Sequence, residues 1–143
     1  MDGKIIDFAT KKINKEFEDN INKPDPALYD LVHMVNKGYE YGVSLSVGGV
    51  IYAGTMVSEA AWYQSQIDLH TARSDQPHAE SYIDYYINLR NEYLNQENNT
   101  ALYIHLKEVK ILSGTPFDTG GGILIWRIRI DRVDAFSVGR IMR

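Results

Sequence analysis

Four histidine and acidic side chains lie close together in the middle of the chain and are the first candidates for chemistry. They are His70, Asp75, His78 and Glu80, which offer the nitrogen and oxygen ligands that transition metals bind. The two histidines do not stand at positions i and i+4, the spacing of a zinc-binding helix. The pattern therefore favours a polar turn, and we expect no metal.

Two further motifs could support catalysis or phosphate binding. The glycines at residues 120–122 precede a predicted strand, whereas a phosphate loop requires a helix N-terminus. We interpret them as a hairpin connection and expect no cofactor. His33 and His105 have no partner visible in the sequence, so we expect surface or boundary residues and no catalytic base.

Length and composition predict one ordinary domain. A chain of 143 residues with 44% apolar content buries about 70% of the surface that its unfolded form exposes. The absence of cysteine excludes a disulfide framework, a thiolate zinc site and a cysteine nucleophile. No apolar run is long enough for a signal peptide or a membrane span. We therefore expect a cytoplasmic protein without membrane insertion.

The first part of the chain predicts two helices. Apolar residues at helical spacing over 4–22 indicate an amphipathic helix that prolines 24 and 26 end. Asp25 is placed as the N-cap of a second helix, with Pro26 at its first position, and Gly38 ends it. We expect residues 1–23 to form a separate N-terminal helix and residues 24–143 a single domain.

From Gly42 the apolar residues alternate, which indicates β-strands. Gly48-Gly49 predicts a hairpin turn between two strands that end near Val57, and Gly54 predicts a bulge or bend. Such a bend favours a small curled sheet or a partly open barrel.

A helical insertion is predicted over about 59–97. Ser58 is a plausible N-cap for its first helix, and the second helix, over 79–96, carries a wide tyrosine face. That face predicts contact with a partner surface, either the sheet of the same chain or a second subunit.

The last third of the chain predicts two more strands, over 103–109 and 123–130. A change in apolar parity indicates a bulge near Lys107-Glu108. The short connection predicts an antiparallel pair, so the fold class is α+β.

Three segments of the chain also carry a family resemblance. The motifs are the Gly48-Gly49 turn between alternating strands, the His105-Leu106-Lys107 triplet, and an ending that runs from Trp126-Arg127 to Val133-Asp134-Ala135-Phe136. In these features, over roughly residues 28–64 and 101–141, the chain resembles gas vesicle accessory protein U. The resemblance implies a non-enzymatic, self-associating protein that helps to assemble or cluster gas vesicles. Its expected partners are further copies of itself and gas vesicle shell or other gas vesicle proteins.

Two alternatives stay open. In outline, the helix followed by a curled strand pair resembles the small barrels of Sm-like or SH3-like proteins, which implies an RNA-binding or protein-binding module. The net charge of −4 has the wrong sign for phosphate contacts, so we expect no nucleic acid. The other alternative is a small-ligand-binding protein or an enzyme of unknown type.

Charge and aromatic patterns nominate residues for self-association. Residues 1–103 hold 8 Lys/Arg and 15 Asp/Glu, whereas residues 104–143 hold 7 and 4. A basic face could therefore meet an acidic face, including Glu59, Asp68 or Asp84, of a second copy. Asp131 and Asp134 beside the arginines predict ion pairs at a rim. The candidate interaction residues are Arg127, Arg129, Arg132, Tyr82, Tyr86 and Tyr93.

Overall fold

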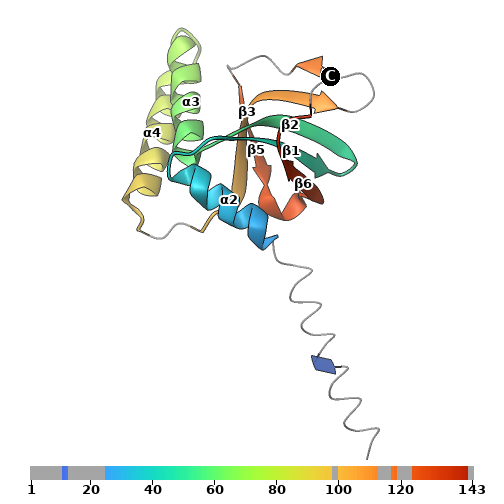
Figure 1. Cartoon of the computed structure of the whole chain (residues 1–143). Helices are drawn as coiled ribbons and strands as arrows, with labels where there is room; N and C mark the ends of the chain where they lie inside the picture. The colour runs from blue at the N-terminus through green and yellow to red at the C-terminus, as the bar shows by residue number, and fades with distance from the viewer. Residues whose placement is uncertain (1–10, 13–24, 98–99, 113–116, 119–123, 142–143) are drawn as a thin grey trace, which may run out of the picture.

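The computed structural model describes residues 11–12, 25–97, 100–112, 117–118 and 124–141. Over these residues the protein is α+β, with helices and one antiparallel sheet (Figure 1). The helix predicted over 4–22 lies outside them except at Lys11 and Lys12, and the glycines 120–122 lie outside them as well.

Helix α2 (Pro26–Asn36) has the predicted cap. The Asp25 Oδ1 atom accepts a hydrogen bond from the Ala27 amide at 2.8 Å, and Pro26 is the first helical residue. Gly38 follows the helix with a φ of 109°, a left-handed conformation that glycine adopts without strain. Both predicted ends of this helix are confirmed.

Strands β1 (Tyr41–Val47) and β2 (Val50–Val57) form the predicted hairpin. Its turn is Gly48-Gly49, where φ is 58° and 82°. Positive φ values at both turn residues match the right-handed twist of the two flanking strands.

The sheet continues through β3 (Tyr103–Leu112) in the order β4-β3-β2-β1-β6. Strand β5 (Ile125–Arg129) also pairs antiparallel with β3, and β6 (Ala135–Val138) pairs antiparallel with β1. No ladder joins β5 to β6 within the described ranges, so the sheet does not close into a barrel. Strand β4 (Phe117–Asp118) was not predicted, because two residues carry no readable alternation.

A bulge in β3 curves the sheet where the sequence predicted it. Thr55 pairs with Lys107 but Ala53 pairs with Lys110, so β3 holds one extra residue, and Glu108 has a φ of 53°. Gly54 lies opposite: a Cβ there would be 3.0 Å from the Lys107 carbonyl oxygen. The close approach of the two strands therefore depends on glycine at this position.

The hydrophobic core lies between α2 and one face of the curved sheet. Its most buried side chains come from α2 and from β1, β2 and β3: Leu28, Val32, Val35, Val43, Leu45, Met56, Ile104, Leu106 and Val109. Ala101 and Ile130, the latter in the 3-10 helix η2 (Ile130–Arg132), also belong to this cluster. The face that the alternation predicted for the core is confirmed by these residues.

Helices α3 (Glu59–Ala72) and α4 (Ala79–Asn95) form an antiparallel hairpin between β2 and β3 in the chain. Figure 1 shows this hairpin standing beside the sheet, with its lower end next to the end of α2. The Ser58 side chain caps α3 by accepting a hydrogen bond from the Ala61 amide at 3.1 Å, as predicted. Among the described helices, none has the length and apolar content needed to cross a membrane.

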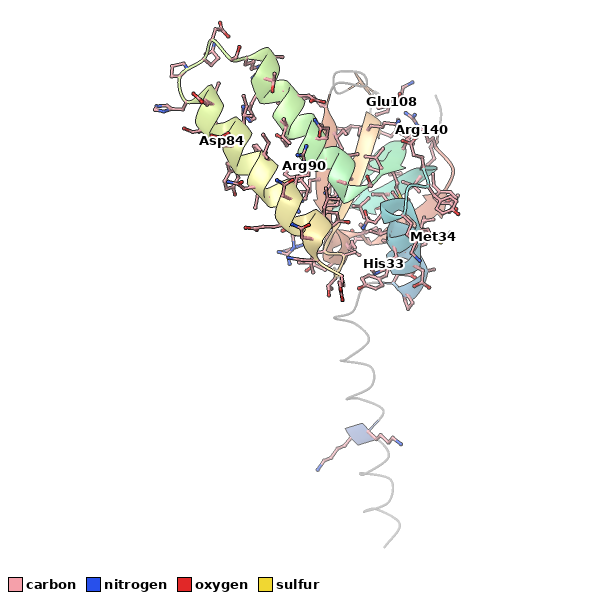
Figure 2. All side chains as sticks on the ribbon, turned by 90° about the vertical axis from the view of Figure 1, so that its left-hand side faces the viewer. His33, Met34, Asp84, Arg90, Glu108 and Arg140 are labelled. Atoms are coloured by element: carbon pink, nitrogen blue, oxygen red, sulfur yellow. The ribbon has the colours of Figure 1, made fainter. Side chains whose placement is uncertain are left out.

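The segment after η2 first pairs β6 with the edge of β1 and then crosses the outer face of β1. The Ser44 hydroxyl donates to the Gly139 carbonyl at 2.9 Å and accepts from the Ile141 amide at 2.9 Å. Arg140 then reaches Glu108 at the bulge, with Nη1 at 3.3 Å from the carboxylate, and the two residues lie side by side in Figure 2. This segment thereby ties β1 to β3.

Candidate functional site between the helical hairpin and the sheet

Helix α3 covers part of the face of β3 and β5 opposite to the core. Because Ser58 starts α3 directly after β2, the first turns of the helix lie over the neighbouring strands. Trp62 and Tyr63 bring their rings to this face, where β3 supplies Tyr103 and His105 and β5 supplies Arg127. An aromatic and charged cluster results.

The Arg127 guanidinium is the centre of this cluster. Its carbon lies 3.8 Å from the centroid of the Tyr103 ring and 4.3 Å from that of Trp62, within the range of cation–π attraction. Nη2 is 3.4 Å from Glu59 Oε1, and the two side chains are 26% and 14% exposed. The Arg127 Nε is buried and has no hydrogen-bond partner among the described residues. Arginine suits this position because its planar group stacks on rings and pairs with a carboxylate.

His105 lies beside Arg127 in the ladder between β3 and β5 and is only 2% exposed. Burial, with a smaller effect of the Arg127 charge, lowers its pKa from 6.5 to about 3, so its ring is neutral near pH 7. The prediction of a surface or boundary residue was wrong. Alternation along β3 placed His105 opposite to the core, but α3 covers that face as well.

Glu59 links the cluster to α2. Its amide donates to Oδ1 of Asn36, the last residue of α2, at 2.9 Å. Burial raises the pKa of the Glu59 carboxyl, and Arg127 partly counteracts this shift. Burial, followed by the nearby Glu59 charge, also raises the pKa of Tyr63 and of Tyr93. The site therefore holds a partly desolvated carboxylate among phenol groups.

A cavity of about 220 Å³ opens between α4 and the start of β3. It is lined by charged, aromatic and apolar side chains: Glu59, Tyr63, Leu89, Glu92, Tyr93, Gln96, Thr100, Leu102, Tyr103 and Arg127. A larger hollow of about 460 Å³ toward α2 shares Tyr93 and Thr100 with it. Such a cavity can hold a small polar group between rings and carboxylates.

Comparison with known proteins gives one family. The model of the family described as "Gas vesicle protein GvpU-like" matches residues 25–141, which is most of the chain. The chain belongs to this family. No curated protein and no solved structure matches. The resemblance seen in the sequence is confirmed, and it extends through the helical hairpin, over which the motifs did not reach.

In this GvpU-like chain the three candidate arginines have different surroundings. Arg127 is paired with Glu59 of its own chain, the residue expected to serve a second copy. Arg129 is exposed and pairs with Asp131 at 2.7 Å, an ion pair at a rim as the sequence indicated. Arg132 is exposed in η2. Arg127 is therefore partly covered by α3, whereas Arg129 and Arg132 are exposed.

The candidate tyrosines on α4 contact aromatic side chains of α3. Tyr86 contacts Trp62 with ring centroids 6.0 Å apart, and Tyr93 contacts Tyr63 at 5.8 Å. Tyr82 stacks on His70 at 5.1 Å but remains 52% exposed. The tyrosine face therefore has a partner within the chain for much of its length.

The other polar candidates have structural surroundings. His70 stacks between Tyr82 and Tyr86, and His78 precedes α4 with a φ of 64°. Across the described ranges, no group of three or more histidine, cysteine or acidic residues could hold a metal. Asp134 accepts a hydrogen bond from the Gly48 amide at 3.0 Å and so supports the hairpin turn.

Sequence reasoning missed the role of Trp62 and Tyr103 around Arg127. The sequence carries only part of the signal, because helical spacing marks Trp62 and Tyr63 as packing residues but does not show which surface they cover. The face that this helix covers depends on the pairing of β3 with β5, which periodicity within one strand does not show.

Proposed function

We propose that this protein is a non-enzymatic accessory protein of gas vesicles that associates with itself and acts in vesicle assembly or clustering. The membership in the GvpU-like family over residues 25–141 carries this proposal. A cytoplasmic location, with other gas vesicle proteins as partners, goes with it.

The distribution of exposed groups supports self-association through opposite charges. Arg129 and Arg132 lie at one end of β5, whereas α4 presents the exposed Asp84, seen on the hairpin in Figure 2. A head-to-tail contact between these surfaces would repeat from one copy to the next. Salt screens such contacts over about 8–10 Å, so they weaken as ionic strength rises.

An aromatic contact is the second mode. Tyr82 and Tyr85 on α4 are 52% and 57% exposed, and tyrosine is enriched at interfaces. Tyr86 and Tyr93 pack on α3, so replacing them would disturb the hairpin itself. The double substitution Tyr82→Ser/Tyr85→Ser is therefore the informative variant.

Light scattering after size exclusion, at low and high salt, tests the proposal. We expect an assembly larger than a monomer at low salt. If the assembly is lost at high salt, and is also lost in the double variant Arg129→Glu/Arg132→Glu, self-association depends on the charged surfaces. Persistence at high salt with loss in the tyrosine variant identifies the aromatic mode. A strict monomer at both salt concentrations rejects self-association.

The sheet also supports a proposal about architecture. Strands β5 and β6 follow each other through η2 but pair with β3 and β1, at opposite ends of the curved β3-β2-β1 set. We propose that this is an opened relative of the small Sm-like or SH3-like barrels. The division into residues 1–23 and a domain over 24–143, interrupted by the hairpin, belongs to the same proposal.

A further inference from the structure

The charged side chains around the small cavity determine whether a positively or a negatively charged ligand is favoured. Glu59 and Glu92 supply two carboxylates, and Arg127 supplies one guanidinium. Arg127 lies 3.4 Å from Glu59, so these two charges offset each other. No salt bridge joins Glu92 to another residue in the described part of the chain. With both carboxylates ionised, one monovalent cation balances the lining, whereas an anion would meet an excess of negative charge.

The rings around the cavity favour a cation as well. Tyr63, Tyr93 and Tyr103 contribute to its lining. Aromatic faces attract guanidinium and ammonium groups, most strongly where water is partly excluded. The chain itself provides an example, because the Arg127 guanidinium stacks 3.8 Å from the Tyr103 ring centroid at the cavity wall.

The size of the cavity limits the ligand to one head group. Its volume of about 220 Å³ is below the roughly 300–1,000 Å³ of pockets that enclose whole drug-sized molecules. The neighbouring hollow of about 460 Å³, which shares Tyr93 and Thr100, offers space for the remainder of a longer molecule.

We infer that this cavity binds one guanidinium or primary ammonium group, held by Glu92 and Glu59 among the three tyrosine rings. The group belongs either to a small organic cation or to an arginine or lysine side chain of a protein. Neither the family match nor the proposed self-association assigns such a site, and binding at it does not depend on them.

Nuclear magnetic resonance titration of the whole chain with butylguanidinium chloride tests the inference. We expect saturable shifts in amide signals of Glu92, Tyr93 and Gln96, beyond those caused by sodium chloride at the same ionic strength. Butyrate and butanol, which keep the alkyl chain but lack the cation, should give no saturable shifts at these positions.

Matched variants locate the site. Glu92→Gln removes a charge from an exposed position, so the fold is retained, and the affinity should fall about threefold to tenfold. Asp84→Asn, on the same helix but outside the cavity lining, should leave the affinity unchanged. Shifts no different from those with sodium chloride, or equal affinity in Glu92→Gln and the unaltered protein, would overturn the inference.

Light scattering in the presence of butylguanidinium shows whether a second copy of this chain supplies the head group. A smaller assembly at a fixed protein concentration shows competition with a basic side chain of a second copy. Saturable binding without a change in mass identifies a small cation or another protein as the source. Because the titration reads individual residues, it remains decisive even if the protein proves to be a monomer.

Discussion

The two faces of strand β3 are covered in different ways. On one face Ile104 and Leu106 meet the apolar stripe of α2, and within the described ranges the Trp126 Nε1 atom is the one buried side-chain polar atom of that cluster without a partner. On the other face Trp62 of α3 covers His105 and Arg127, whose Nε2 and Nε atoms are buried without partners among the described residues. Buried polar atoms without partners reduce stability. We infer that the α2 face chiefly stabilises the fold, whereas the hairpin face retains chemistry that stability alone does not require.

The largest effect is expected on the α2 face. Leu106 is fully buried at the centre of β3, so Leu106→Ala removes apolar contacts and leaves a cavity. We expect the free energy of unfolding to fall by about 2–5 kcal/mol, measured by urea denaturation. The control Leu94→Ala, at a position 59% exposed on α4, should change it by less than about 0.5 kcal/mol. Equal losses in the two variants would contradict the assignment of the core.

The hairpin face should make stability depend on pH. The folded pKa of His105, about 3, lies below the value of 6.5 expected in the unfolded chain. The stability that depends on neutral His105 is therefore fully present above pH 6.5. It is lost as pH falls from 6.5 toward 3. Between pH 6.5 and 5, the unaltered protein should lose about 2 kcal/mol more unfolding free energy than His105→Leu. Parallel pH profiles of the two proteins would show that His105 is not buried as described.

A smaller effect is expected from the contact between hairpin and sheet. Arg127→Ala removes the contacts with three rings and leaves Glu59 without its partner, so we expect a loss of roughly 1–2 kcal/mol. Hydrogen exchange should accelerate more in α3 than in α2. Arg129→Ala, which breaks only the exposed pair with Asp131, is the matched control and should cost less than about 1 kcal/mol. Equal acceleration of hydrogen exchange in α2 and α3 would mean that α2 and the helical hairpin unfold together.

The sequence predicted those parts of the fold that depend on local chemistry. Asp25, Ser58 and Gly48-Gly49 act through neighbours in the chain, and all were placed correctly. The bulge near Glu108 was also predicted, because an extra residue changes the apolar parity on one strand. The short strand β4 left no such pattern.

The candidate site depends on contacts between distant segments. Arg127 and Glu59 are separated by 68 residues, and their pairing follows from the placement of α3 over β3 and β5. Alternation along β5 places Arg127 on the face opposite to the core. It gave no information about whether a helix covers that second face, which is why His105 was assigned to the surface.

The crossing segment after η2 also has a consequence for the kinetics of folding. Strand β1 meets β2 across a tight turn, but Ser44 and Gly139, which tie β1 to the segment after β6, are 95 residues apart. Closing so long a loop carries an entropic cost that must be met before the contact stabilises the chain, and distant contacts slow folding. We therefore expect the β1-β2 ladder to form early and β6 to dock late. Until it docks, one edge of β1 keeps unpaired backbone groups that can bind another strand.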